Sequence, residues 1–95
     1  MVEKVISPQG ASNDVPGMQA FVMVKVGPGF SRDMVREILE VEGVEEVFEL
    51  TGDIDMLVKV RATDIEDLSR TVFKIRETKG ILETDTRMII SSQKP

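Results

Sequence analysis

Residues 51–64, Thr-Gly-Asp-Ile-Asp-Met-Leu-Val-Lys-Val-Arg-Ala-Thr-Asp, contain a glycine turn, a strand and the start of a helix in one short run. The turn centres on Gly52, a residue that tolerates the backbone conformations of tight turns. Apolar residues then alternate from Met56 to Val60, which is the period of a β-strand with one buried face. Asp64 follows as a residue type that caps helix N-termini. The stretch therefore predicts a turn, a strand and a helix in that order.

The same pattern occurs twice in the chain. Val22–Val26 (VMVKV) returns as Met56–Val60 (MLVKV), and Glu42–Glu46 (EGVEE) returns as Lys79–Glu83 (KGILE). Each copy is typical of a strand, a helix and a second strand. Two such units joined by a tight turn predict an α+β fold of the ferredoxin-like βαββαβ type, with a four-stranded antiparallel sheet and both helices on one face.

Both expected helices have a cap, an apolar stripe and a terminating glycine. Ser31 is the expected cap of the first helix and Asp64 that of the second, with Asp67 in a capping-box position. Gly43 and Gly80 are the expected terminators in the left-handed conformation. The apolar stripes expected to face the sheet are Met34, Val35, Ile38 and Leu39 in the first helix, and Ile65, Leu68, Val72 and Ile75 in the second.

Both faces of the predicted sheet are apolar. In the first strand, Ala20, Val22 and Val24 point to one side, while Phe21 and Met23 point to the other. Two helices cover only one face, and an exposed apolar patch of this kind usually marks an interface. We therefore expect sheet-to-sheet packing into a two-fold homodimer. The residues expected at this dimer interface are Phe21, Met23, Phe48, Leu50, Leu57 and Met88.

Composition narrows the range of functions. The formal net charge of −5 and the scattered Lys and Arg residues argue against direct nucleic-acid binding. No apolar run is long enough to span a membrane and the N-terminus carries no export signal, so we expect a cytoplasmic protein without a membrane partner. Residues 1–17 are expected to form an arm or linker, residues 18–91 one folded domain, and residues 92–95 a tail.

Catalysis is not expected. The chain has no His, Cys, Tyr or Trp, which leaves only carboxylates, Lys, Arg and hydroxyls for chemistry. We predict no catalytic residues and no cofactor. The acidic residues Asp53, Asp55, Glu83 and Asp85 match no metal cage in their spacing, so no metal site is predicted. A small enzyme on a dimeric ferredoxin-like barrel nevertheless remains the alternative, because such enzymes also dimerise through their sheets and the amino-acid composition does not distinguish the two.

The run 51–64, together with Gly80–Thr86 (GILETDT), resembles the ligand-binding half of Lrp/AsnC-type amino-acid-responsive regulators, also called the RAM domain. The resemblance covers roughly residues 18–91. It implies a sensor that binds a free amino acid or related metabolite, forms dimers that assemble further to octamers or decamers, and modulates transcription. Residues 1–17 are too short for the usual helix-turn-helix domain, so we expect a stand-alone form that co-assembles with full-length Lrp/AsnC regulators. An ACT-like amino-acid sensor has the same order of elements and is a second alternative.

Two groups of residues are candidates for ligand binding. A glycine turn lets backbone amides converge on a carboxylate, and a nearby Asp can accept from an ammonium group. Thr84 and Thr86 share one face of a strand and offer two hydroxyls. On spacing alone, an ordinary hairpin turn and ordinary strand threonines are the more common explanation of these residues. The resemblance implies a ligand site at Gly52, Asp53, Ile54, Asp55, Thr84 and Thr86, with Ile54 at a position where the family often has Tyr or Phe.

Overall fold

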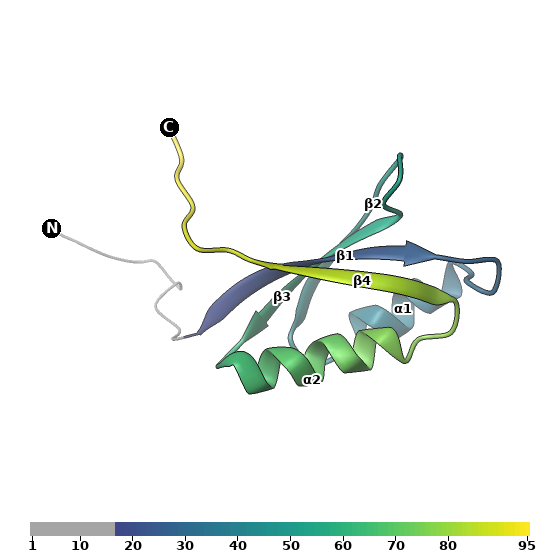
Figure 1. The fold of residues 1–95 in the computed structure, drawn as a ribbon, viewed down its shortest axis with the longest axis horizontal. Helices are drawn as coiled ribbons and strands as arrows, with labels where there is room; N and C mark the ends of the chain where they lie inside the picture. Colours follow the sequence, from purple (N-terminus) through teal and green to yellow (C-terminus); the bar gives the residue numbers. More distant parts are fainter. Residues whose placement is uncertain (1–16) are drawn as a thin grey trace, which may run out of the picture.

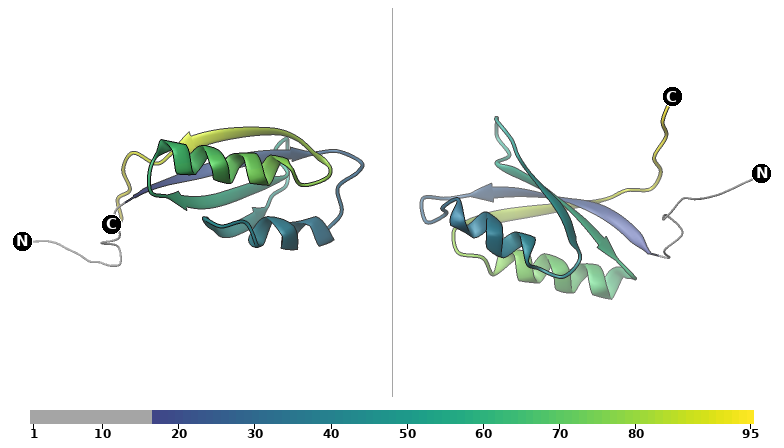
Figure 2. Two further views of the ribbon diagram at one scale, coloured as in Figure 1. Left: turned by 90° about the horizontal axis from the view of Figure 1, so that it is seen from below. Right: turned by 180° about the vertical axis from the view of Figure 1, so that it is seen from behind.

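The computed structural model describes residues 17–95 and contains one four-stranded antiparallel sheet and two helices. Its elements are β1 (Met18–Val26), α1 (Asp33–Leu39), β2 (Val44–Glu49), β3 (Met56–Ala62), α2 (Ile65–Arg76) and β4 (Ile81–Met88). The strand order is β2-β3-β1-β4, and both helices lie on one side of the sheet (Figures 1 and 2). The predicted ferredoxin-like fold is confirmed, whereas residues 1–16 of the expected arm lie outside the described residues.

The core lies between the sheet and the two helices. β1 and β3 pair with Ala20 opposite Val60, Val22 opposite Val58 and Val24 opposite Met56, and all of these side chains are buried. The helices contribute three further buried apolar side chains, which are Ile38, Leu68 and Ile75. The alternation in the sequence therefore identified the correct buried face of both central strands.

α2 begins as the sequence predicts. The Asp64 carboxylate accepts a hydrogen bond from the backbone N–H of Asp67 at 2.8 Å. The Asp67 carboxylate in turn accepts from the backbone N–H of Thr63 at 2.9 Å, one residue earlier than in a standard capping box. This backbone hydrogen bond from Thr63 lowers the pKa of Asp67 below its ordinary value.

α1 differs from the prediction at its start. Ser31 does not cap the helix through its side chain. Arg32 occupies the cap position in a helical conformation and forms no side-chain cap hydrogen bond. The chain turns tightly here, and the carbonyl of Ser31, rather than its hydroxyl, accepts from the N–H of Met34 at 2.9 Å. The Arg32 guanidinium instead lies 3.3 Å from Glu49 at the end of β2.

The edges of the predicted stripes are also wrong. Leu39 is 50% exposed and Ile65 is 56% exposed, and each is the terminal residue of its helix. Thr71 is buried in α2 although it is polar, and its hydroxyl donates to the carbonyl of Glu42 at 3.2 Å. Gly43 and Gly80 have the expected positive φ, but both helices end earlier, so these glycines turn the chain into β2 and β4 rather than cap the helices.

Candidate functional site

The face of the sheet opposite the helices, here called the open face, carries an apolar row that crosses β2, β3 and β1. The register places Phe48 of β2 opposite Leu57 of β3, and Leu57 opposite Met23 of β1. Asp85 of β4 ends the row. Phe48 is 38% exposed, and Met23 and Leu57 are partly buried by their neighbours on the sheet. Leu50, just after β2, is exposed as well.

Charged residues rim the apolar row. Phe21 lies between Lys59 and Arg87 in the neighbouring row. Further along, Arg61 pairs with Glu45 at 2.9 Å, and Gln19 donates to the same carboxylate at 3.0 Å. Partial burial disfavours the charge on Glu45, but the hydrogen bonds from Arg61 and Gln19 outweigh it and hold the pKa of this carboxyl below its usual value. An apolar centre with a charged rim has the layout of a protein interface.

Met88 lies on the other face from the one expected. It pairs with Ala20, a core residue, so its side chain is on the helix side of β4. Side chains alternate along a strand, and Met88 therefore shares a face with Thr84 and Thr86, not with Phe21. Met88 does not belong to the open face.

The turn between β2 and β3 projects from the sheet on the side away from the helices (Figure 1). Gly52 lies in this turn with φ +106°, and a Cβ atom placed on it would meet no heavy atom within 4 Å. Space is therefore available for a side chain, but the backbone conformation disfavours any residue other than glycine. Asp53, the next residue, is exposed.

Asp55 anchors this hairpin to β1. Its carboxylate accepts a hydrogen bond from the backbone N–H of Val26 at 2.9 Å. Its own backbone N–H donates to the carbonyl of Val24 at 3.0 Å, and its carbonyl accepts from the N–H of Leu50 at 2.9 Å. One carboxylate oxygen of Asp55 thus accepts a backbone hydrogen bond that holds the hairpin to β1. The sequence did not indicate this structural role.

A hollow of about 160 Å³ brings Ile54 next to β4. Lys25 and Glu83 face each other across β1 and β4 in this region. The hollow therefore offers an ammonium group beside carboxylates, which is the complement of a zwitterionic amino acid. Its lining residues are Met23, Lys25, Ile54, Glu83, Thr84 and Asp85.

The structure does not bring the candidate ligand residues together in one place. Ile54 and Thr84 line the hollow described above, although the Thr84 side chain is on the helix side of β4, and Gly52, Asp53 and Asp55 are not among the lining residues. Thr86 instead lines a groove of about 360 Å³ between β4 and α2, which also contains Leu68, Ser69, Val72, Phe73, Arg76 and Met88. Lys25 and Glu83 were not among the predicted ligand residues. The sequence shows Lys25 only as a single lysine in the first strand. Its place in the hollow follows from its pairing with Glu83 across the sheet.

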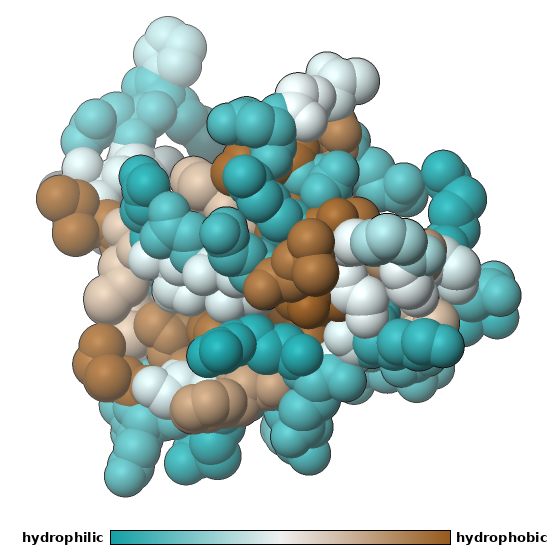
Figure 3. Space-filling view, turned by 45° about the vertical axis from the view of Figure 1, so that its right-hand side comes forward, coloured by the Kyte–Doolittle hydropathy of each residue, from teal (hydrophilic) through white to brown (hydrophobic). Residues whose placement is uncertain are grey.

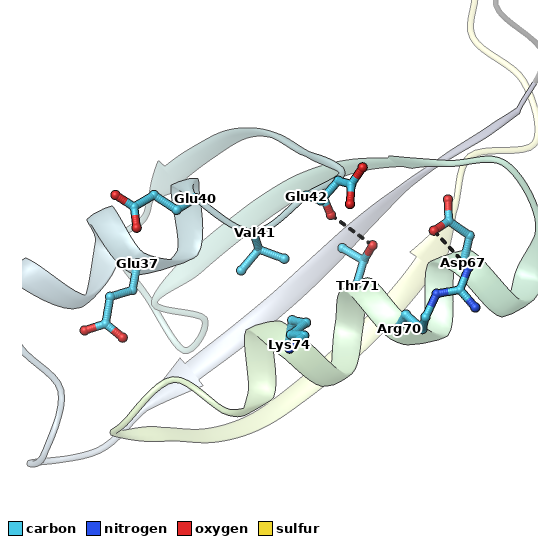
Figure 4. A pocket seen from close by; sticks show the side chains of 8 residues that line it. All are labelled: Glu37, Glu40, Val41, Glu42, Asp67, Arg70, Thr71 and Lys74. Atoms are coloured by element: carbon cyan, nitrogen blue, oxygen red, sulfur yellow. Dashed lines mark hydrogen bonds and ion pairs between the residues drawn. The ribbon is translucent and has the colours of Figure 1, made fainter.

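Another cleft, of about 390 Å³, lies between the C-terminal end of α1 and α2 (Figure 4). Glu37 and Glu40 come from the α1 side, whereas Arg70 and Lys74 come from α2. Arg70 is already paired with Asp67 at 3.4 Å. Across residues 17–95, no group of three or more acidic side chains is placed to hold a metal ion. In the same part of the chain, no helix is long and apolar enough to cross a membrane.

Comparison with known proteins gives a consistent picture. Residues 19–95 match the sequence model of the family described as Lrp/AsnC ligand binding domain. The chain is 36% identical over 74 residues to the HTH-type transcriptional regulator LysM of Sulfurisphaera tokodaii, covering 77% of this chain and 53% of that protein. It is 34% identical over 88 residues to a homocitrate synthase of Sulfolobus acidocaldarius, covering 92% of this chain but 18% of that enzyme. The chain thus spans about half the length of the regulator that it matches.

A solved structure supports the fold. The transcriptional regulator NMB0573 of Neisseria meningitidis, solved as a complex with L-Met, superimposes with a TM-score of 0.75 at 21% sequence identity. The match covers 94% of this chain and 60% of that one.

Proposed function

Because the chain belongs to the Lrp/AsnC ligand-binding domain family, we propose that it is a sensor domain that binds a free amino acid or a related small metabolite and passes on its occupancy through subunit association. The match to the family over residues 19–95 carries this proposal. The matched family is a ligand-binding one, and the proposed role requires no bond to be made or broken.

The proposed ligand site is the end of the open face beside the β2–β3 turn. The backbone amides around Gly52 and the Lys25 ammonium serve the ligand carboxylate, and Glu83 or Asp53 serves its ammonium group. Ile54 and Met23 provide an apolar floor for the side chain. Support comes from the mixed charges of the hollow, from the positive φ of Gly52, and from the amino acid that the Neisseria regulator holds on the same fold.

The proposed dimer forms through the open face, with Phe21, Met23, Phe48, Leu50 and Leu57 at its centre. A two-fold axis lets the same apolar row and charged rim serve both subunits. Leu57 is already partly buried within one subunit, so completing its burial contributes less than the roughly 1.5–3 kcal/mol of a fully exposed side chain.

Further assembly and signalling complete the proposal. Dimers join into octamers or decamers, and the chain co-assembles with full-length Lrp/AsnC regulators in the cytoplasm, modulating transcription without touching DNA itself. A ligand held near a subunit junction stabilises the assembly that forms its site, by an amount set by its differential affinity.

A second candidate function follows from one observation. The match to homocitrate synthase spans 88 residues of this chain and only 18% of the enzyme, so a segment of this kind is part of an enzyme chain. The alternative is therefore an effector-binding domain that acts on a biosynthetic enzyme. Mixing the chain with a full-length regulator and with such an enzyme, followed by native mass spectrometry, separates the two, because only the true partner forms a hetero-oligomer.

The experiment that tests the ligand site is a thermal-shift screen of free amino acids at millimolar concentration. A hit is repeated on Gly52→Val, whose β-branched side chain resists positive φ. Gly29→Val is the matched control, because Gly29 has no positive φ and a Cβ there would meet nothing closer than 3.8 Å. We expect the ligand-induced shift to be lost in Gly52→Val and kept in Gly29→Val. Equal shifts in both variants would remove the turn from the site.

A further inference from the structure

β4 is an edge strand whose outer side is free in the described part of the chain. The N–H of Ile89 donates to the carbonyl of Gln19 at 2.9 Å, which fixes the phase of the pairing between β1 and β4. Because the facing residues of antiparallel strands alternate in hydrogen bonding, the odd-numbered residues of β4 direct their backbone groups to β1. The backbone groups of Thr84, Thr86 and Met88 point outward. They form a row of donors and acceptors ready for another strand.

Apolar side chains gather beside this free edge. The groove between β4 and α2 has Phe73, 60% exposed, and Met88, 44% exposed, along its length. Leu82 at the start of β4 is 69% exposed, and Ile90 just beyond its end is 94% exposed. Figure 3 shows that apolar residues reach the surface between hydrophilic ones. A free edge with apolar surface at both ends and along one side is suited to strand addition.

We propose that β4 pairs antiparallel with β4 of a second copy, with the two Thr86 residues facing each other at a two-fold axis. This contact joins two four-stranded sheets into one continuous sheet. It lies at right angles to the packing direction of the open face and is a second interface, distinct from the dimer proposed above.

Charge complementarity selects this register. With Thr86 opposite Thr86, Asp85 of each copy faces Arg87 of the other, and the four charges alternate in sign. Within one chain, Asp85 and Arg87 already pair at 2.9 Å while both remain more than half exposed, so they are free to share this wider network. The neighbouring registers that keep the outward backbone groups matched place Asp85 opposite Asp85 or Arg87 opposite Arg87, and directly opposed like charges destabilise a strand pair.

Apolar contacts favour the same register. Leu82 lies at the register shift near the start of β4 and Ile90 lies just beyond its end, so this register brings each close to the other residue on the second copy. These are the two most exposed large apolar residues of the described chain. The register also sets the two β4–α2 grooves side by side, with Met88 opposite Thr84 of the other copy. Exposed apolar surface is thereby removed from water on both sides of the axis.

The opposite edge of the sheet is less suited to pairing with a second copy. β2 carries Glu45, Glu46 and Glu49, and its pairing with β3 is interrupted by an irregularity between Val44 and Glu46. Like charges and bulges are the usual protection of an edge strand against pairing with another copy. β4 has a register shift too, next to Ile81, but its pairing with β1 is regular from Glu83 to Met88, and Arg87 offsets its acidic residues. The self-association is therefore assigned to β4.

Two isologous interfaces on one chain generate higher assemblies. A face contact and an edge contact give a closed ring of dimers if their angles close, and an open fibre if they do not. Cross-linking tests the register directly, because the chain has no cysteine. In the proposed register the Thr86 Cα atoms lie about 5.5 Å apart, within disulfide range. The Thr84 residues of the two copies are roughly 13 Å apart at about 3.3 Å per residue along the strands, which is beyond that range.

We expect Thr86→Cys to form a covalent dimer under mild oxidation and Thr84→Cys to form none. Absence of the Thr86→Cys dimer, or equal dimer from both variants, would overturn the proposal. A second pair of variants needs no cysteine. Thr86→Pro removes an outward N–H without removing a hydrogen bond to β1, and Thr86→Val keeps that N–H.

Native mass spectrometry separates the edge contact from the open-face dimer. We expect Thr86→Pro to lose every species larger than a dimer and Thr86→Val to keep them. Combining Thr86→Pro with Leu57→Glu on the open face is expected to give monomer, while Leu57→Glu alone leaves an edge-paired dimer. An unchanged mass distribution in Thr86→Pro refutes the edge contact. A Leu57→Glu variant that retains the larger species refutes the open-face dimer instead.

Discussion

Asp55 provides the sharpest test of how the hairpin is held. Its carboxylate accepts from the partly buried N–H of Val26 at 2.9 Å, and Asp55→Ala leaves that donor without a partner. Hydrogen bonds to charged groups contribute about 1.5–3 kcal/mol, and the partial exposure of the site places the loss near the lower end. For a domain of this size, a loss of about 1.5 kcal/mol lowers Tm by roughly 6–12 °C.

The assay is urea and thermal unfolding followed by circular dichroism, at one fixed protein concentration because association contributes to apparent stability. Asp55→Asn is the matched control, since its amide oxygen still accepts from Val26 while the charge is gone. We expect Asp55→Ala to be clearly less stable than Asp55→Asn. If both variants were as stable as the wild type, the anchoring role would be refuted, and the Asp55 carboxylate would again be a candidate to bind the ligand.

Three further outcomes are expected. Ile38→Ala, at a fully buried site beneath the sheet, should lose about 2–5 kcal/mol in denaturant unfolding; a loss below about 1 kcal/mol would contradict the packing of α1 described here. The folded-state pKa of Asp67 is lowered from its ordinary value of 3.8, so the ionised carboxylate stabilises the fold above pH 3.8 and this stabilisation is lost as the pH falls through the folded-state pKa. Asp67→Asn should therefore reduce the loss of unfolding free energy at acid pH, measured by denaturant unfolding across a pH series. Leu57→Glu should weaken the open-face dimer by about 3 kcal/mol or more, at least roughly a hundredfold in Kd by sedimentation, and an unchanged Kd would exclude this face.

Much of the fold is readable from the sequence because local and global signals agree. Buried and open-face side chains alternate regularly along the repeated VMVKV and MLVKV strands. Asp64, directly before the apolar stripe of α2, caps that helix as predicted. The errors fall where local signals are short. α1 has only seven residues, so the turn at Ser31 rather than the apolar stripe sets its start, and Leu39, its last residue, is half exposed.

The candidate site was less predictable than the fold, because it depends on pairing between strands. The sequence predicts Met88 at the open face, although it has the same parity as Thr84 and Thr86, because only the register with Ala20 fixes which face that is. Lys25 of β1 lies opposite Glu83 of β4, and the register of these two strands shifts at the next residue of β1. The sequence of one strand does not show this pairing. The role of Asp55 depends on a backbone donor from Val26, distant in sequence.

The central claim is that ligand binding and subunit association are thermodynamically linked. Such a linkage acts equally in both directions, so it can be measured through ligand affinity. If a ligand favours the assembly, the assembly binds the ligand more tightly by the same factor. The direct measurement is a binding isotherm for the amino acid that gives the largest thermal shift, taken at protein concentrations above and below the association midpoint. The account predicts tighter binding at the higher concentration and a weaker, concentration-independent Kd for Leu57→Glu. One identical Kd for all samples would contradict it.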